Sequence, residues 1–338
     1  MMNIVSSFTN SIELPSPTKV ANLRRRAGRT WQAVGPLVIF VAVFAVVSIL
    51  TPTFIQGGGL TIVASSAAPI LLVALGQALV LNIGSIDLSN ASVTLLGAIL
   101  LAMTLGPVGS VAPIVVVLIV TLFGAINGLI VVHAQVPSFA LTLGTFGIFQ
   151  SAALVVSGAT TVYVTENGDG VAALYQGGVA GLPGTFIIGV IVAVLAWAFL
   201  RFTRAGQGMT AIGKNESGAI FSGIRTKWLK VIAFALSGFM AGLAGITIIA
   251  QAGSASPTGL GSDLLLPGIA AAIVGGTSIS GGVTNPINVI FGALTVALVP
   301  IATTAIGIDA QAQNLVYGAV IIVVVALTLS RSPNSIVK

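Results

Sequence analysis

Three features of the sequence have residue types that could carry chemistry. The run "GGTSISGG" at 275–282 is rich in glycine, His133 is the single histidine, and Asp87 stands alone in a long apolar region. A glycine-rich loop that binds nucleotide phosphates needs a following lysine, which this run lacks, so we exclude ATP hydrolysis by this chain. His133 has no second histidine with which to share a metal, and we interpret it as an interfacial side chain. We expect no catalytic residue, no metal site and no cofactor.

Other enzyme chemistries are disfavoured by what the sequence lacks. It contains no cysteine, so it has no disulfide, no thiolate metal site and no cysteine nucleophile. Its seven acidic residues are scattered along the chain rather than paired. The net charge of +6 comes from basic clusters with few aromatic residues beside them, which argues against nucleic acid as a partner. The sequence therefore predicts a protein that is not an enzyme.

Composition shows which class of protein this is. Of the 338 residues, 56% are hydrophobic and 6% are charged, whereas soluble domains carry roughly a quarter charged residues. A helix that crosses a bilayer needs about 20 mostly apolar residues, because its backbone amides must bond within the segment. We predict an all-α polytopic membrane protein with about ten transmembrane helices. The predicted spans are 33–51, 60–83, 88–106, 110–132, 138–157, 184–201, 229–251, 264–282, 286–306 and 310–330.

Two of these spans differ from the others in composition. Glycine, proline and serine interrupt the segments 60–83 and 264–282. A broken or re-entrant helix is therefore as good an interpretation of each as a straight one.

The positions of lysine and arginine predict the orientation, because positively charged loops stay cytoplasmic. Basic residues precede the first span, cluster within 201–230 and follow the last span, and an even number of spans separates these groups. Both termini are therefore predicted to be cytoplasmic. The longest outer loop, 158–183, carries Glu166 and Asp169 and no basic residue. The predicted organisation is a basic tail at 1–32, a transmembrane domain at 33–331 with a cytoplasmic loop at 202–228, and a cytoplasmic tail at 332–338.

Charge is too sparse in the predicted spans to suit an ion-driven carrier. Asp87 is the only formally charged residue between Arg29 and Glu166. Carriers coupled to protons or sodium usually keep several ionisable groups in the membrane. Since the chain also lacks a nucleotide site, either a partner supplies the energy or the pathway is passive. A passive channel and a secondary carrier for small neutral solutes stay open as alternatives.

One charged segment interrupts the apolar sequence in its middle. The stretch "GKNESGAIFSGI" at 213–224 combines charged and small residues with two isolated apolar side chains, which predicts a short amphipathic helix on the cytoplasmic surface. Such a helix between two spans can dock a soluble subunit. The alternative is a solvated loop that only satisfies the positive-inside rule. The residues predicted to couple to a partner are Gly213, Lys214, Asn215, Glu216, Gly218, Ile220, Phe221, Ser222 and Gly223.

Four motifs follow one another along the chain: "ALVLNIGSIDLSNASVTLLGAI", "FALTLGTFGIF", "GMTAIGKNESGAIFSGI" and "IAAAIVGGTSISGG". In this order they resemble the permease subunits of ribose/xylose/galactose-type sugar ABC importers, and the resemblance covers roughly residues 35 to 330. In the third motif, the positions that match the family's ATPase-docking loop are Ala211, Gly213, Asn215, Ser222, Gly223 and Ile224. Ser85, Asn90, the pair 218–219 and the turn 283–286 depart from the usual pattern.

The resemblance implies an ABC importer permease fold that carries a pentose, hexose or related polyol across the inner membrane of a bacterium. It also implies three partners: an ABC ATPase subunit, a periplasmic sugar-binding protein, and a second permease copy or close paralogue. The small-xxx-small patterns "GAING" at 124–128 and "GFMAG" at 238–242 suit the pairing of two chains. They suit helix packing within one chain equally well.

A neutral sugar requires a path lined by neutral donors and acceptors with some aromatic surface. The residues predicted to line it are Gln77, Asn82, Asp87, Ser89, Asn90, Thr142, Thr145, Phe146 and Gln150. For Asp87 and Ser89 a second interpretation is helix capping, in which the side chain bonds free backbone amides. Both interpretations hold if a capped half-helix end faces the path.

Single cysteines introduced into this cysteine-free chain test the orientation. Glu166→Cys should react with a membrane-impermeant maleimide in intact cells, whereas Lys214→Cys should react only after the inner face is exposed. Reaction of both positions from the same side would show that the predicted topology is wrong.

Overall fold

The computed structural model describes residues 17–56, 58–258, 260–309 and 312–328, and the chain divides into two units, 1–35 and 36–338. Each unit is considered by itself. The described part of the first unit is the beginning of helix α1 (Pro17–Leu50). Part of the predicted tail at 1–32 and all of the tail at 332–338 lie outside the described residues.

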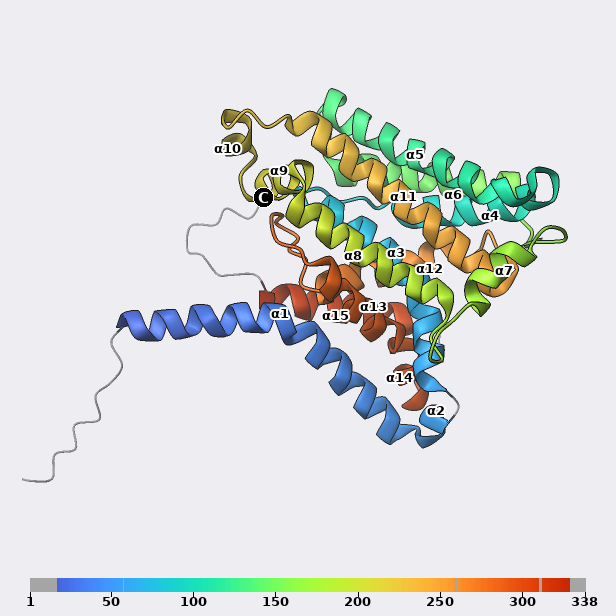
Figure 1. Ribbon diagram of the computed structural model, residues 1–338, viewed down its shortest axis with the longest axis horizontal. Coiled ribbons are helices and arrows are strands. Elements are labelled where there is room, and N and C mark those ends of the chain that lie inside the picture. Colours follow the sequence, from blue (N-terminus) through green and yellow to red (C-terminus); the bar gives the residue numbers. More distant parts are fainter. Residues whose placement is uncertain (1–16, 57, 259, 310–311, 329–338) are drawn as a thin grey trace, which may run out of the picture. The chain divides into compact units, whose positions relative to one another are not determined.

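Helices make up nearly all of the regular structure (Figure 1). After α1 they are α2 (Pro52–Gln56), α3 (Gly59–Asn82), α4 (Asn90–Val108), the 3-10 turn η1 (Gly109–Val111), α5 (Ala112–Ala134), α6 (Ser138–Val156), α7 (Asp169–Gln176), α8 (Gly184–Phe202), α9 (Arg204–Lys214), α10 (Glu216–Phe221), α11 (Thr226–Ala252), α12 (Leu260–Val274), α13 (Pro286–Ala297), α14 (Val299–Ala305) and α15 (Gln313–Thr328). Two short strands, β1 (Val162–Tyr163) and β2 (Ser254–Ala255), pair antiparallel.

Six helical runs within the described residues are long and apolar enough to cross a membrane. The longest, 90–134, contains both α4 and α5 and folds back at Gly109, whose φ of 68° glycine adopts without strain. Helices α4 and α5 then pack against each other. Shorter apolar helices cover 34–50, 263–274 and 313–323. The predicted all-α membrane architecture is confirmed, while the total of about ten crossings stays a prediction.

The two predicted spans with interrupted sequences turn out differently. Helix α3 is continuous through Pro69, and its neighbours α11, α12 and α13 bury it along most of its length. Helix α12 instead ends at Val274, so the predicted span 264–282 was too long. Glycines with positive φ turn the chain after it, and the Oγ1 atoms of Thr277 and Thr284 lie 2.7 Å apart in a hydrogen bond across this turn.

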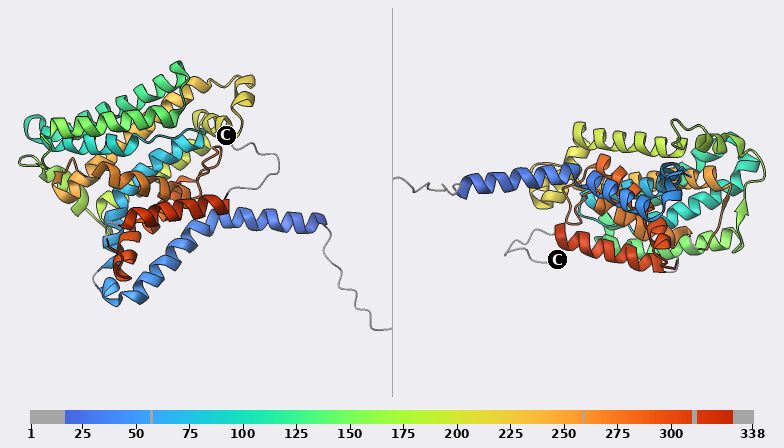
Figure 2. Two further views of the ribbon diagram at one scale, coloured as in Figure 1. Left: turned by 180° about the vertical axis from the view of Figure 1, so that it is seen from behind. Right: turned by 90° about the horizontal axis from the view of Figure 1, so that it is seen from below.

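Helix α11 makes the main contacts of the second unit, since it packs against α5, α3 and α4 (Figure 1, Figure 2). The contact with α5 depends on glycine. A Cβ added at Gly124 would collide with the Phe234 carbonyl oxygen, and one added at Gly238 would collide with that of Val120. The patterns "GAING" and "GFMAG" thus pack against each other within one chain, which confirms the second of the two interpretations.

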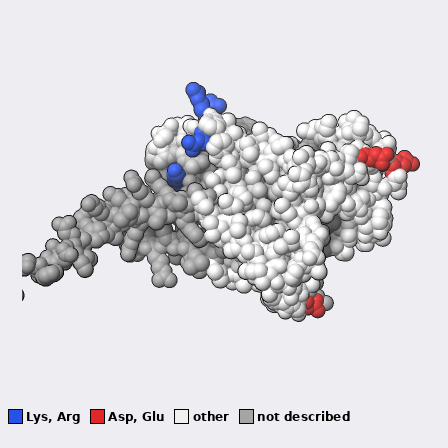
Figure 3. Space-filling model, turned by 60° about the horizontal axis from the view of Figure 1, so that its bottom comes forward, with Lys and Arg blue, Asp and Glu red and all other residues white. Residues whose placement is uncertain are grey.

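Charged side chains are distributed unevenly over the face shown in Figure 3, where lysine and arginine gather at one end and acidic residues lie elsewhere. The described basic residues of 201–230 belong to the end of α8, to α9 and to the beginning of α11. This arrangement agrees with the predicted inner end of the helices, although the orientation in the membrane stays a prediction.

Replacement of Gly124 tests the contact between α5 and α11. Gly124→Ala should lower the free energy of unfolding by about 1–3 kcal/mol, because the methyl group has no space beside the α11 backbone. Gly144→Ala on α6 is the matched control, since nothing lies within 4 Å of its added Cβ. Tryptophan fluorescence during thermal unfolding in detergent measures both variants. Equal stability of the two would contradict the glycine contact.

Candidate functional site

The first candidate site is a buried polar network centred on Asp87, in the connection between α3 and α4. The Asp87 side chain is 1% exposed. Its Oδ1 accepts hydrogen bonds from the Ser89 backbone N–H at 3.1 Å and the Ser89 hydroxyl at 2.6 Å. Its Oδ2 accepts one at 2.8 Å from the hydroxyl of Ser237, about three turns into α11. Within the described part of the chain no lysine or arginine pairs with Asp87, so polar donors compensate its burial.

Three amide side chains surround this carboxylate and connect four helices. Asn127 on α5 donates to the Ser89 hydroxyl at 2.8 Å. Asn90 on α4 donates to the Ser237 hydroxyl at 2.5 Å and to its carbonyl at 3.1 Å. Gln77 on α3 donates to the Asp87 carbonyl oxygen. The network therefore joins α3, α4, α5 and α11 at one point.

Helix α6 is attached to the same connection. The Leu88 backbone N–H donates to the Thr142 hydroxyl at 3.0 Å, and that of Ile86 donates to the Ser138 hydroxyl at 3.0 Å. Two backbone amides of the connection are thereby paired with hydroxyl groups of α6, which fixes the connection to that helix.

The structure separates the predicted path residues into three places. Those around the network are Gln77, Asp87, Ser89, Asn90 and Thr142. Asn82 is buried at the end of α3, where its amide donates to the Thr210 hydroxyl of α9 at 3.1 Å. The remaining three, Thr145, Phe146 and Gln150, lie half-buried along α6. The contacts of Asp87 fit a role in holding the turn, and path lining stays a prediction for all of them.

Four of these side chains retain an unused hydrogen-bond acceptor. The buried amide oxygens of Gln77, Asn82, Asn90 and Gln150 accept no hydrogen bond from the described part of the protein. Buried acceptors are normally paired. Every one of these four atoms belongs to a residue that the sequence predicts to line the path.

Sequence reasoning missed three members of the network: Ser138, Asn127 and Ser237. A signal for two of them was present, because Asn127 lies inside "GAING" and Ser237 directly precedes "GFMAG". The glycine contact between α5 and α11 brings both polar side chains toward Asp87.

The second candidate site is the charged segment, which forms two helices rather than the predicted single one. Asn215 separates them, because its backbone is extended and its Oδ1 accepts the Gly218 N–H at 3.0 Å as the cap of α10. Gly223, with φ of 76°, ends α10, and the Ile224 N–H bonds back to the Ala219 carbonyl at 3.0 Å. Three matched positions of the docking motif, Asn215, Gly223 and Ile224, thus set the two ends of α10.

Helix α10 presents its apolar side chains outward. Ile220 is 54% exposed and Phe221 is 91% exposed, while only Ala219 is buried. Glu216 is not free for a partner, because its Oε1 lies 2.6 Å from the Lys230 Nζ at the start of α11. Among the predicted coupling residues, Gly213 does not lie on the outward face, because it sits near the end of α9 and packs against the backbone of Asn82 and Gly282.

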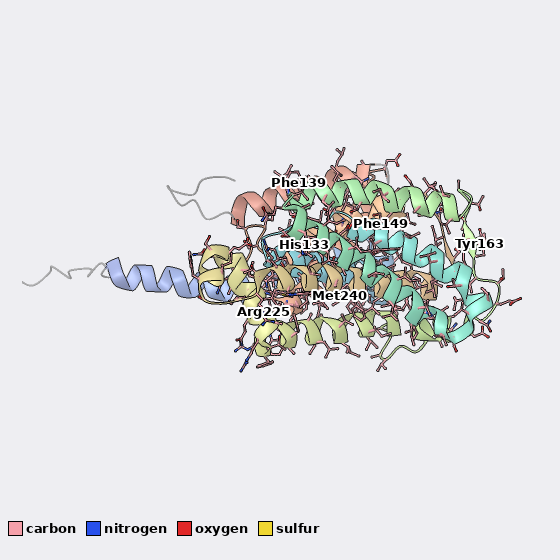
Figure 4. All side chains as sticks on the ribbon, turned by 90° about the horizontal axis from the view of Figure 1, so that it is seen from above. His133, Phe139, Phe149, Tyr163, Arg225 and Met240 are labelled. Atoms are coloured by element: carbon pink, nitrogen blue, oxygen red, sulfur yellow. The ribbon has the colours of Figure 1, made fainter. Side chains whose placement is uncertain are left out.

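The described residues contain no cluster of three or more potential metal ligands. His133 is exposed, and its Nδ1 lies 2.9 Å from the Leu129 carbonyl oxygen. Figure 4 shows Arg225 and Tyr163 at opposite ends of the helices, with Met240 between them.

Comparison with known proteins shows which family the chain belongs to. Residues 59–325 match the family described as "Branched-chain amino acid transport system / permease component". The chain belongs to this permease family. The ribose import permease protein RbsC of Haemophilus influenzae is 34% identical over 293 residues, which are 85% of this chain and 90% of the relative. No solved structure matches the chain.

Two further relatives of this permease are named for different substrates. The D-allose transport system permease protein AlsC of Escherichia coli is 31% identical over 88% of this chain and 91% of its own length. The autoinducer 2 import system permease protein LsrC of Escherichia coli is 32% identical over 85% of this chain and 84% of its own length. The predicted resemblance to sugar ABC importer permeases is confirmed. With its apolar helices, the chain is a multi-pass inner-membrane protein.

Replacement of Asp87 tests the network. Asp87→Asn should lower the free energy of unfolding by about 1–3 kcal/mol, because an amide offers one acceptor oxygen where the carboxylate offers two. The folded permease should remain in the membrane, with a modest fall in transport. Asp169→Asn, on an exposed residue of α7, is the control.

Thermal unfolding of the two purified variants and uptake in cells are the measurements. Severe loss of uptake at unchanged stability would show that the charge of Asp87 acts in transport. Loss of the protein from the membrane would remove Asp87 from the predicted path.

Proposed function

We propose that this chain is the transmembrane permease subunit of an ABC importer that moves a sugar or related polyol into the cell. A separate ATPase energises it, and a periplasmic binding protein delivers the sugar. The observation that carries the proposal is α10, a capped helix whose exposed Phe221 lies at the basic end of the bundle. The substrates for which the relatives are named, ribose and D-allose among them, support the substrate class.

The polar interior supports a neutral, hydroxyl-rich substrate. Sugar hydroxyls donate hydrogen bonds, and the unpaired amide oxygens of Gln77, Asn90 and Gln150 are acceptors. The single charge in this region, Asp87, is already occupied by three donors. A path built from these groups binds a neutral substrate without a free charge that would trap it.

The ATPase is proposed to bind α10. A cleft of about 560 Å³ separates α10 from the ends of α5 and α6, and its walls include Ile220, Lys227 and Phe139. A partner that fills this cleft would bury the Ile220 side chain and meet the positive charge of Lys227, and the exposed Phe221 ring follows Ile220 on α10 as a further contact. Aromatic anchors of this kind dominate interface energies.

A second permease copy, or a close paralogue, is proposed to lie against α6. This helix carries the half-buried path residues Thr145, Phe146 and Gln150 and also exposes Leu143 and Ile148. A second copy on this face would complete the wall of a path, and lipid would cover the other apolar faces.

Reconstitution tests the proposed function. In proteoliposomes that contain the permease, its ATPase and its binding protein, uptake of labelled sugar should require ATP. Phe221→Ala should weaken binding of the ATPase by about tenfold or more, because a well-buried anchor contributes about 2 kcal/mol. Co-purification and uptake should fall together. Tyr163→Ala, which removes an exposed aromatic ring from the other end of the helices, is the matched control and should retain the ATPase.

ATP-independent equilibration of the sugar would instead identify a passive channel. If Phe221→Ala keeps normal ATPase binding and normal uptake, α10 is not the docking site and is only a solvated part of the surface.

A further inference from the structure

A close backbone contact joins the proposed docking segment, formed by α9 and α10, to two distant parts of the chain. Gly213, at the end of α9, packs against the end of α3 and the turn between α12 and α13. A Cβ added at Gly213 would collide with the Asn82 carbonyl oxygen and the Gly282 nitrogen. A Cβ added at Gly281 would lie 2.9 Å from both the Gly213 Cα and the Gly84 nitrogen. We call this contact of Gly213, Gly281 and Gly282 the glycine junction.

Hydrogen bonds hold the glycine junction together. The Gly282 N–H donates to the Asn82 carbonyl oxygen at 2.9 Å. The Asn82 amide donates to the Thr210 hydroxyl, one turn before Gly213 on α9, at 3.1 Å. Asn82 is fully buried. Helix α9 is therefore bonded to α3, and α3 is bonded to the α12–α13 turn, at a single place.

The junction is a stiffer connection than the one made by α10. Helix α10 contacts α11 through the pair of Glu216 and Lys230, and the Glu216 side chain is half exposed. Exposed ion pairs contribute little and rearrange readily. Backbone atoms in van der Waals contact have no side-chain rotamers with which to absorb a displacement, and close-packed interiors transmit strain.

The junction also leads directly to the polar network. Asn82 ends α3, and Gln77 on the same helix donates to the Asp87 carbonyl oxygen. A displacement of α9 along the junction therefore shifts the helix that holds the α3–α4 connection. This connection is also bonded to α6 through Thr142.

We propose that the glycine junction transmits the motion of the docked ATPase to α3 and to the α12–α13 turn, with Gly213 and Thr210 as positioning residues. This inference rests on the proposed function of an ATP-driven importer. Neither residue is needed for the ATPase to bind, since the exposed anchors of docking lie on α10.

The variant Gly213→Ala tests whether the junction transmits motion without being needed for the ATPase to bind. The backbone of Gly213 is outside the left-handed region, so alanine fits its conformation and only the steric contact changes. In the complex with ATPase and binding protein, we expect unchanged co-purification and basal ATP hydrolysis within twofold of the original. Uptake, and the stimulation of hydrolysis by sugar-loaded binding protein, should fall at least tenfold. Gly170→Ala on α7, with open space around its added Cβ, is the matched control.

Thr210 provides a second test that adds no atom to the junction. Thr210→Val removes the hydroxyl that accepts from Asn82 and should lower uptake severalfold with assembly intact. Thr210→Ser keeps the hydroxyl and should restore uptake. Normal uptake in Gly213→Ala and Thr210→Val, or loss of co-purification in parallel with uptake, would overturn the proposal. If the unsubstituted permease binds no ATPase or moves no sugar with ATP, the proposed function itself fails.

Discussion

A carboxylate buried among membrane helices must find its donors within the protein, and Asp87 imposes this constraint on the packing around it. Its two oxygens accept hydrogen bonds from Ser89 and Ser237, and these hydroxyls accept from Asn127 and Asn90 in turn. The donors come from α4, α5 and α11, so these helices must approach closely. Glycines at the α5–α11 contact permit this approach. The polar network and the glycine contact therefore depend on each other. The network supplies the polar connection between α5 and α11, and the close approach of these helices brings Asn127 to Ser89 and Ser237 to Asp87.

The proposed docking segment is built on a different principle. Short helices are marginal in water unless their ends are satisfied, and α10, with six residues, has both ends satisfied. Asn215 caps its beginning, and the turn at Gly223 closes its end. The capping residues leave the apolar side chains of α10 free to face outward, because the helix does not need them for its own stability. A helix held by its ends rather than by a buried face suits the binding of a partner.

The sequence predicted the positions of the long helices well, because hydrocarbon requires every backbone amide to be paired and so fixes the length of an apolar run. The prediction from sequence was wrong where capping by a single residue decides where a helix ends. Asn215 divides the predicted docking helix, and the glycines after Val274 end a predicted span early. Several polar residues near Asp87 were identified from the sequence, namely Gln77, Ser89, Asn90 and Thr142, but the bonds of the network were not, since these join residues up to 150 positions apart. Ser237 was missed because an isolated serine in an apolar helix can also bond to its own backbone.

The two candidate sites share the same two helices, and this sharing has a mechanical consequence. Helix α3 meets the docking segment at Asn82 and the network at Gln77, while α11 meets the docking segment at Lys230 and the network at Ser237. The α3 connection consists of close backbone packing and buried hydrogen bonds, whereas the α11 connection is a partly exposed ion pair. If a bound partner pushes on this segment, as proposed, the unequal stiffness of the two connections means that α3 is displaced more than α11. The network between these helices then experiences shear rather than a common translation. Hydroxyl and amide groups, which can rotate and exchange partners, tolerate such shear better than a fixed pair of opposite charges would.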